Sequence, residues 1–173
     1  MVLGMSLAAF TTVHVIISLV AIASGIVVVI GMLGSHRMPA WTALFLFMTI
    51  LTSVTGFLFP IKGFTPALAV GAISLLILAV TCFALYARRL DRGWRWVYVL
   101  TAAAALWFNI FVLIVQSFQK VSFLNPHAPQ VGPPFSEPQN MHFVIAQAAA
   151  LVIMVVLGLV AAFKFRPGVT LGS

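Results

Sequence analysis

The sequence predicts an all-α, polytopic membrane protein, a single domain over residues 1–173 that forms a bundle of five transmembrane helices. Three observations predict this class. Only 6% of the 173 residues are charged and 63% are hydrophobic, whereas a soluble domain carries about 25% charged residues. The mean hydropathy is +1.20. Five apolar stretches of roughly 20 residues, the length that crosses a bilayer, hold no Asp, Glu, Lys or Arg in their interiors.

The predicted helices cover residues 7–33, 41–59, 66–87, 94–118 and 141–163. The first is interpreted as a retained helix, because no Lys or Arg precedes it and its apolar run is too long for a secretory signal. The second ends before Pro60, and Pro66 suits the first turn of the third. Arg88 and Arg89 close the third helix, where positive charge favours the carbonyl end. The fourth begins at Trp94, and the fifth follows a proline-rich connection.

This connection, residues 119–140, contains five of the nine prolines and is the one long link between predicted helices. Proline removes a backbone donor and interrupts regular helix, so we expect an ordered cover over the outer end of the bundle. Long loops on a compact scaffold often carry function. A plain spacer between the fourth and fifth helices is the alternative interpretation.

The distribution of positive charge predicts the orientation. Connections of one parity carry seven Lys and Arg side chains, and those of the opposite parity carry two. The positive-inside rule therefore predicts an outside N-terminus and a cytoplasmic C-terminus. The seven are Arg37, Arg88, Arg89, Arg92, Arg95, Lys164 and Arg166, and the two are Lys62 and Lys120. The net charge of +7 then reflects topology and contact with anionic lipid, and no nucleic-acid partner is expected.

Polar side chains inside the spans are costly in lipid and therefore informative. They are His14, Asn109, Gln116, His142 and Gln147. Hydroxyl side chains such as Ser53, Thr55 and Ser74 can bond the backbone of their own helix, so they are not treated as site residues.

Three of the polar side chains fall at one depth. His14, Gln116 and His142 are each separated by 21 to 23 residues from a Lys or Arg on the cytoplasmic side. At about 1.5 Å per residue, they lie roughly 32–35 Å from those charges, near the outer edge of the membrane. We therefore predict a polar pocket formed by His14, Gln116 and His142 beneath the proline-rich connection, which His127 and Gln119 could join.

Two histidines at one depth admit three kinds of chemistry. His14 and His142 could be the axial ligands of a b-type haem, or bind copper or zinc with His127 as a third nitrogen ligand. They could also hold a polar head group, such as a quinone carbonyl, by hydrogen bonds. The competing interpretation is that each imidazole bonds a backbone carbonyl or interfacial water and has no ligand.

Two further patterns concern packing in the membrane. Small residues four apart, as at Ala21 and Gly25 or Gly158 and Ala162, would let helices approach closely. Aromatic side chains at the cytoplasmic ends of helices are typical of an interfacial belt. The belt consists of Trp41, Trp94, Trp96 and Tyr98.

The sequence indicates no hydrolytic or group-transfer centre. No carboxylate lies inside a span, so the proton or sodium relays of secondary transport have no carrier. No phosphate-binding glycine loop, zinc-protease motif or nucleophile elbow is present. The single cysteine, Cys82, excludes an intrachain disulfide. These absences favour a protein that is not an enzyme.

The leading functional hypothesis is a non-catalytic membrane protein, either an accessory subunit of a larger complex or a ligand-binding protein that uses the outer pocket. One alternative is an electron-transfer protein linked to b-haem or quinone through His14 and His142. The other is a passive channel or small transporter lined by Asn109, Gln116 and Gln147. The expected partners are membrane lipids and other membrane protein subunits.

Three runs carry a resemblance to known proteins: residues 41–46 (WTALFL), 55–60 (TGFLFP) and 109–118 (NIFVLIVQSF). They resemble runs in small, uncharacterised bacterial multi-spanning membrane proteins, and the resemblance covers most of the chain. It implies the bacterial inner membrane as the location and implies no activity. In its number of helices for this chain length, the protein is also similar to the tryptophan-rich sensory/translocator proteins, which bind porphyrins and sterols. Their tryptophan- and proline-rich loop pattern is absent here, so no residue is carried over.

Overall fold

The computed structural model describes residues 2–60, 66–125 and 141–166, and its long elements are all helices. They are α1 (Leu7–Leu33), α2 (Pro39–Gly56), α3 (Pro66–Cys82), η1 (Phe83–Ala87), α4 (Trp94–Lys120) and α5 (Met141–Lys164). Element η1 is a π-helical turn that continues α3. With α3 and η1 taken together, five helices are long and apolar enough to cross a membrane. This confirms the prediction of a multi-spanning, all-α membrane protein.

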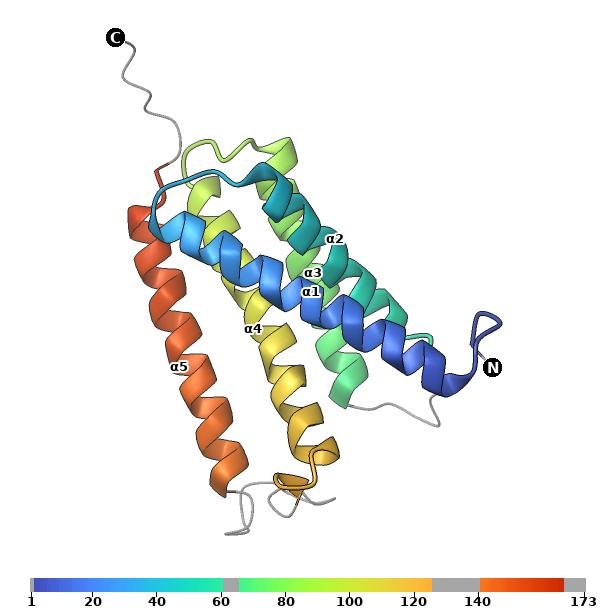
Figure 1. Ribbon diagram of the computed structural model, residues 1–173. Coiled ribbons are helices and arrows are strands. Elements are labelled where there is room, and N and C mark those ends of the chain that lie inside the picture. Colours follow the sequence, from blue (N-terminus) through green and yellow to red (C-terminus); the bar gives the residue numbers. More distant parts are fainter. Residues whose placement is uncertain (1, 61–65, 126–140, 167–173) are drawn as a thin grey trace.

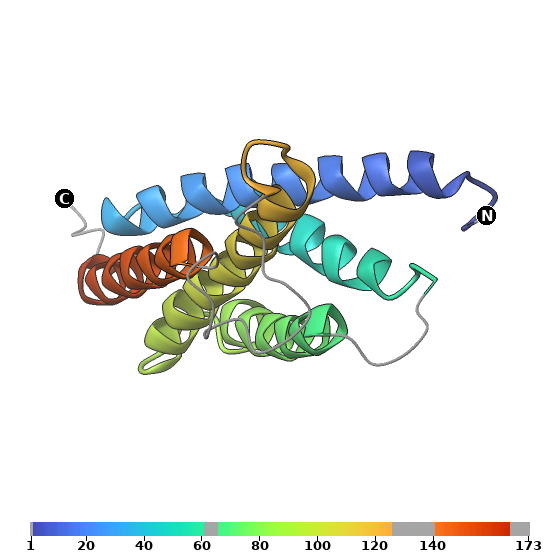
Figure 2. The same ribbon diagram turned by 90° about the horizontal axis from the view of Figure 1, so that it is seen from below.

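Helix α4 is the centre of the bundle, because it packs against α1, α3 and α5. The most extensive pairings are α1 with α2 and α4 with α5. Figure 1 shows α1 crossing the bundle obliquely, and Figure 2 shows α1 and α3 on opposite sides of it. In Figure 1, the carboxyl ends of α1 and α5 and the amino ends of α2 and α4 all lie at the same end of the bundle.

The helix boundaries differ from the predicted ones mainly in α2. Helix α1 covers the predicted range and begins after Ser6, whose hydroxyl accepts a hydrogen bond from the Ala9 N–H at 3.2 Å. Helix α2 begins at Pro39, since proline suits the first turn of a helix, and ends at Gly56 rather than at residue 59. The N–H groups of Phe57 and Leu58 bond carbonyls three residues back, each at 3.1 Å. The chain thus tightens into a turn before Pro60.

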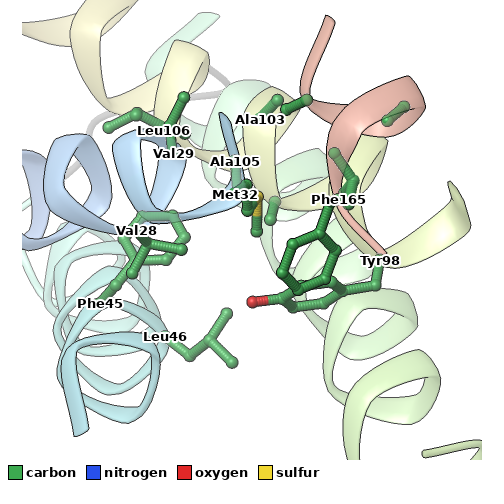
Figure 3. Packing of buried hydrophobic residues seen from close by; sticks show 14 of the residues in the cluster. Val28, Val29, Met32, Phe45, Leu46, Tyr98, Ala103, Ala105, Leu106 and Phe165 are labelled. Carbon is green, nitrogen blue, oxygen red and sulfur yellow. The ribbon is translucent and has the colours of Figure 1, made fainter. Parts of the chain in front are cut away.

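Small residues let α1 approach α2 and α4 closely, as predicted. A Cβ atom at Gly25 would lie 2.8 Å from both Leu106 Cδ1 and Phe45 Cε2, and both neighbours are only 1% exposed. Figure 3 shows Phe45 beside Val28 of α1, in the same buried cluster as Leu106. A Cβ atom at Gly158 of α5 would lie 3.1 Å from that of Ala103 in α4. Helix contacts of this kind rely on van der Waals packing, the main attraction between helices in lipid.

Candidate functional site

His14 joins α1 to the end of α2. Its Nδ1 lies 2.7 Å from Thr55 Oγ1, and its ring meets the ring of Phe59 edge-on at a centroid distance of 5.2 Å. The Thr55 hydroxyl also lies 2.7 Å from the Leu51 carbonyl, and the tautomer of His14 decides which partner donates in the His14–Thr55 hydrogen bond. In the tautomer that carries its proton on Nδ1, Nε2 of His14 keeps the lone pair that a ligand would need.

The other residues of the predicted outer pocket lie on different helices. Gln116 is exposed on α4, and His142 is exposed in the first turn of α5. The start of α5 packs on α4, where Phe143 meets Phe118 edge-on at 5.5 Å. Both views place this start away from the amino-terminal part of α1. His127 and residues 126–140 of the predicted cover lie outside the described residues, so a shared pocket stays a prediction.

A metal cluster was also predicted at this end, from His14, His142 and His127. In the described ranges, which leave out His127, no group of three or more His, Cys, Asp or Glu side chains is close enough to hold a metal ion. The metal site with His127 and the haem ligation by His14 and His142 stay predictions.

The polar side chains in mid-membrane contact neighbouring helices. Asn109 is 9% exposed and donates from Nδ2 to Thr49 Oγ1 of α2 at 3.2 Å. Gln147 of α5 donates from Nε2 to the Phe111 carbonyl of α4 at 3.1 Å. The predicted channel-lining residues thus face different partners, Asn109 towards α2 and Gln147 towards α4.

Helix α2 presents a row of hydroxyl groups to its neighbours. Thr55 Oγ1 bonds the Leu51 carbonyl of its own helix, as the sequence indicated that these hydroxyls can do. Ser53 Oγ instead donates to Ser74 Oγ of α3 at 3.3 Å, because α2 and α3 approach closely enough to pair side chains, which is favourable in lipid. Along the whole helix the contacts run from Thr42–Tyr98 through Thr49–Asn109 and Ser53–Ser74 to Thr55–His14.

A pocket of about 150 Å³ opens at the end of the bundle opposite to the predicted outer site. We call this end the arginine end, since it carries Arg37, Arg88, Arg89, Arg92 and Arg95. The apolar lining includes Val28, Met32, Leu85, Leu90 and Phe165. The polar lining is formed by His36, Arg37, Thr42, Tyr86 and Tyr98. The pocket therefore combines an apolar wall with several hydrogen-bond donors.

Two buried hydroxyls lie in the pocket wall. Tyr98 is 3% exposed and Thr42 is 6% exposed, and their oxygen atoms are 3.5 Å apart. An O–H···O hydrogen bond is usually about 2.7–2.8 Å long, so the contact is weak and leaves donor capacity for a third group. The sequence placed Tyr98 in an interfacial belt, and that interpretation is wrong because the bundle buries the ring.

The wall beside Tyr98 is held by the carboxyl end of α5. Phe165 is 2% exposed, and its ring lies 6.0 Å from that of Tyr98. Figure 3 shows the two rings side by side. The Arg95 guanidinium donates to the carbonyls of Phe165 and, at 3.3 Å, Ala162. A cation at these unpaired carbonyls complements the helix dipole. Arg95 therefore fixes the position of Phe165 against the pocket.

The opposite wall contains a π-helical turn and a strained loop. In η1 the Arg88 N–H bonds the Phe83 carbonyl five residues back at 2.9 Å. Leu90 has a positive φ of 64°, an unusual conformation for a branched residue. Its side chain is buried, with 9% of its surface exposed. Such strain costs on the order of 1 kcal/mol and is frequent at ligand sites, as are π-helical turns.

Charge at the arginine end is strongly positive. Seven Lys and Arg side chains belong to it, and Asp91 is the one carboxylate side chain in the part of the chain that the structure describes. Asp91 lies 4.0 Å from Arg92, with both side chains exposed, so this pair is weak. Arg37 has no carboxylate partner within the described residues.

Comparisons with protein-family models, with curated proteins and with solved structures find no match to this chain. The pocket, its two hydroxyls and the surrounding positive charge are therefore the features from which a function can be inferred.

Proposed function

We propose that the protein is a non-catalytic integral membrane protein that binds an amphipathic small molecule at the arginine end. The pocket between α1, α2, η1, α4 and the end of α5 carries this proposal. Ligand sites are typically concave and apolar, with a few polar groups that orient the ligand. Here Tyr98 and Thr42 supply buried hydroxyls, and Met32 and Phe165 supply apolar surface.

The size of the pocket limits what it can enclose. A cavity of roughly 150 Å³ in an apolar protein core holds one benzene ring, and the present pocket has about the same volume. It therefore encloses one polar head or ring, and the rest of the ligand lies along the surface of the bundle. Tyr86, which lines the pocket, is 60% exposed, so a molecule dissolved in the bilayer would enter on this side.

The proposed location is the bacterial inner membrane, with the arginine end in the cytoplasm. Its support is the positive-inside rule and the seven-to-two division of Lys and Arg between the two ends. A role as an accessory subunit is compatible with ligand binding, because the ligand could fill a groove between this chain and another membrane protein.

A pocket-filling substitution tests the proposal. Leu85 lines the pocket, and Leu85→Trp would place an indole ring in it. The matched control is Leu76→Trp on the same helix, where the side chain is 69% exposed towards lipid. Native mass spectrometry of protein extracted in mild detergent should show one retained adduct in wild type and in Leu76→Trp. Leu85→Trp should lose the adduct, and equal retention by all three proteins would refute the proposal.

A further inference from the structure

A second depression lies next to the pocket at the arginine end, on the α1 side. This apolar groove of about 430 Å³ is lined by Val27, Ile30, Gly31, Gly34, His36 and Met38. His36 and Met38 also line the pocket, so the two spaces adjoin. Ile30 is 62% exposed, and the groove is therefore open to the hydrocarbon of the bilayer. A polar pocket and an adjoining apolar groove fit a molecule with a compact head and an alkyl chain.

The connection between α1 and α2 holds the cationic side of the pocket in place. The His36 N–H donates to the Gly31 carbonyl at 2.8 Å, and the Ser35 N–H to the Met32 carbonyl at 3.0 Å. Ser35 Oγ also accepts from the Arg166 N–H at 2.9 Å, which ties this connection to the end of α5. The backbone next to Arg37 is thus hydrogen-bonded both to the end of α1 and to the segment after α5. The binding of a ligand by Arg37 therefore requires little additional ordering of the backbone.

The donors around the pocket match an acidic head group. The Arg37 guanidinium offers several N–H donors in a planar fork that suits phosphate oxygens, and the Tyr98 and Thr42 hydroxyls are weakly paired at 3.5 Å. Asp91, the one described carboxylate, lies beside Arg92, and it does not line the pocket. Basic pockets between transmembrane helices on the cytoplasmic side are known to bind anionic lipid head groups.

We infer that the ligand of this pocket is a lipid with a net negative, phosphate-containing head group, bound by Arg37 with the Tyr98 and Thr42 hydroxyls and with its chain in the α1 groove. This inference rests on the proposed function and adds the chemical class of the ligand. Arg37 is the residue that distinguishes an anionic head from a zwitterionic one, because the other polar lining groups are neutral hydroxyls and an imidazole.

The test compares lipids that differ in net charge. Delipidated wild-type protein in detergent is titrated with phosphatidylglycerol, phosphatidylcholine or soluble glycerol 3-phosphate, and lipid adducts are counted by native mass spectrometry. Phosphatidylglycerol should bind about tenfold more tightly than phosphatidylcholine, because both lipids carry the phosphodiester but the choline cation is repelled by the Arg37 guanidinium. Arg37→Gln should remove this preference, and Arg37→Lys should retain it. Arg92→Gln, with the same loss of charge at the same end but outside the pocket, should leave it unchanged.

The outcomes separate the inference from the proposed function. Equal binding of the two lipids, with both lost in Leu85→Trp, would overturn the acidic head group and leave the ligand-binding function standing. Failure of wild type to bind any lipid would overturn both. An equal effect of Arg37→Gln and Arg92→Gln would show attraction by the general positive field and would overturn the role of Arg37. Binding of glycerol 3-phosphate as tight as that of phosphatidylglycerol would overturn the role of the groove.

Discussion

The close approach of α1 to α2 and α4 at Gly25 leads to a sharp prediction for Gly25→Ala. The added Cβ would lie 2.8 Å from both Leu106 Cδ1 and Phe45 Cε2, and neither neighbour has free space, since each is 1% exposed. Overpacking a dense core costs about 1–3 kcal/mol, and the better helix propensity of alanine returns up to about 1 kcal/mol. We therefore expect a net loss of about 1–2 kcal/mol in the free energy of unfolding.

The assay is reversible unfolding in mixed micelles of a mild detergent and dodecyl sulfate, followed by tryptophan fluorescence. The matched control is Gly93→Ala, because a Cβ at Gly93 meets no atom within 4 Å and its φ of −67° suits alanine. The control should stay within about 0.5 kcal/mol of wild type, the range of substitutions away from packed contacts. If Gly25→Ala were as stable as the control, the described packing of α1 against Phe45 and Leu106 would be wrong.

Three further predictions concern the mid-membrane polar pair, the orientation and the histidines. Asn109→Ala removes the hydrogen bond to Thr49 and should lower the free energy of unfolding by about 1 kcal/mol in the same assay, the scale of hydrogen bonds between membrane helices; no loss would mean that the pair contributes nothing. In a Cys82→Ala background, a membrane-impermeant maleimide should label Arg92→Cys in inverted inner-membrane vesicles and not in intact cells; the reverse pattern would invert the proposed orientation. If His14 and His142 ligate haem, His14→Ala and His142→Ala should each abolish a b-type reduced-minus-oxidised spectrum; a spectrum unchanged in both variants would end that hypothesis.

The helices could be predicted from the sequence because their signals are local. An uninterrupted apolar run is enough to define α1, and Pro66 marks the start of α3. The start of α2 was predicted at Trp41, whereas the helix begins at Pro39. The end of α2 was predicted less well, since Phe57 was assigned to the helix. There the chain turns early and brings Phe59 onto Phe10, with ring centroids 4.9 Å apart. A contact between residues so distant in sequence leaves no trace in the hydropathy pattern.

The pocket could not be predicted, because its walls come from separate parts of the chain. Tyr98 near the start of α4 has the same sequence context as a belt aromatic, and only the packing of Phe165 against it reveals that it is buried. The inter-helix role of the α2 hydroxyls was missed for a similar reason, since Ser53 could equally bond its own backbone. Their frequency in α2 was the available signal, because α2 has the lowest hydropathy of the five spans, 1.4 against 2.2 to 2.8 in the others.

The depth argument selected residues by their polarity and their level in the membrane, yet equal depth does not place side chains together. His14 bonds Thr55 across the α1–α2 contact, whereas His142 begins α5, which packs mainly on α4. Two residues at the same height in a bundle can face different neighbours, and the lateral arrangement of helices is set by packing that single-helix patterns do not contain.

The most direct test of the central claim is an experimental structure of the wild-type protein in nanodiscs made from its native membrane lipids. The account predicts density for one head group in the pocket at the arginine end, within hydrogen-bond distance of the Tyr98 hydroxyl and the Arg37 guanidinium, with a chain along the groove on α1. A pocket closed by Leu90 or filled by water alone, with ligand density instead between His14 and His142, would contradict it.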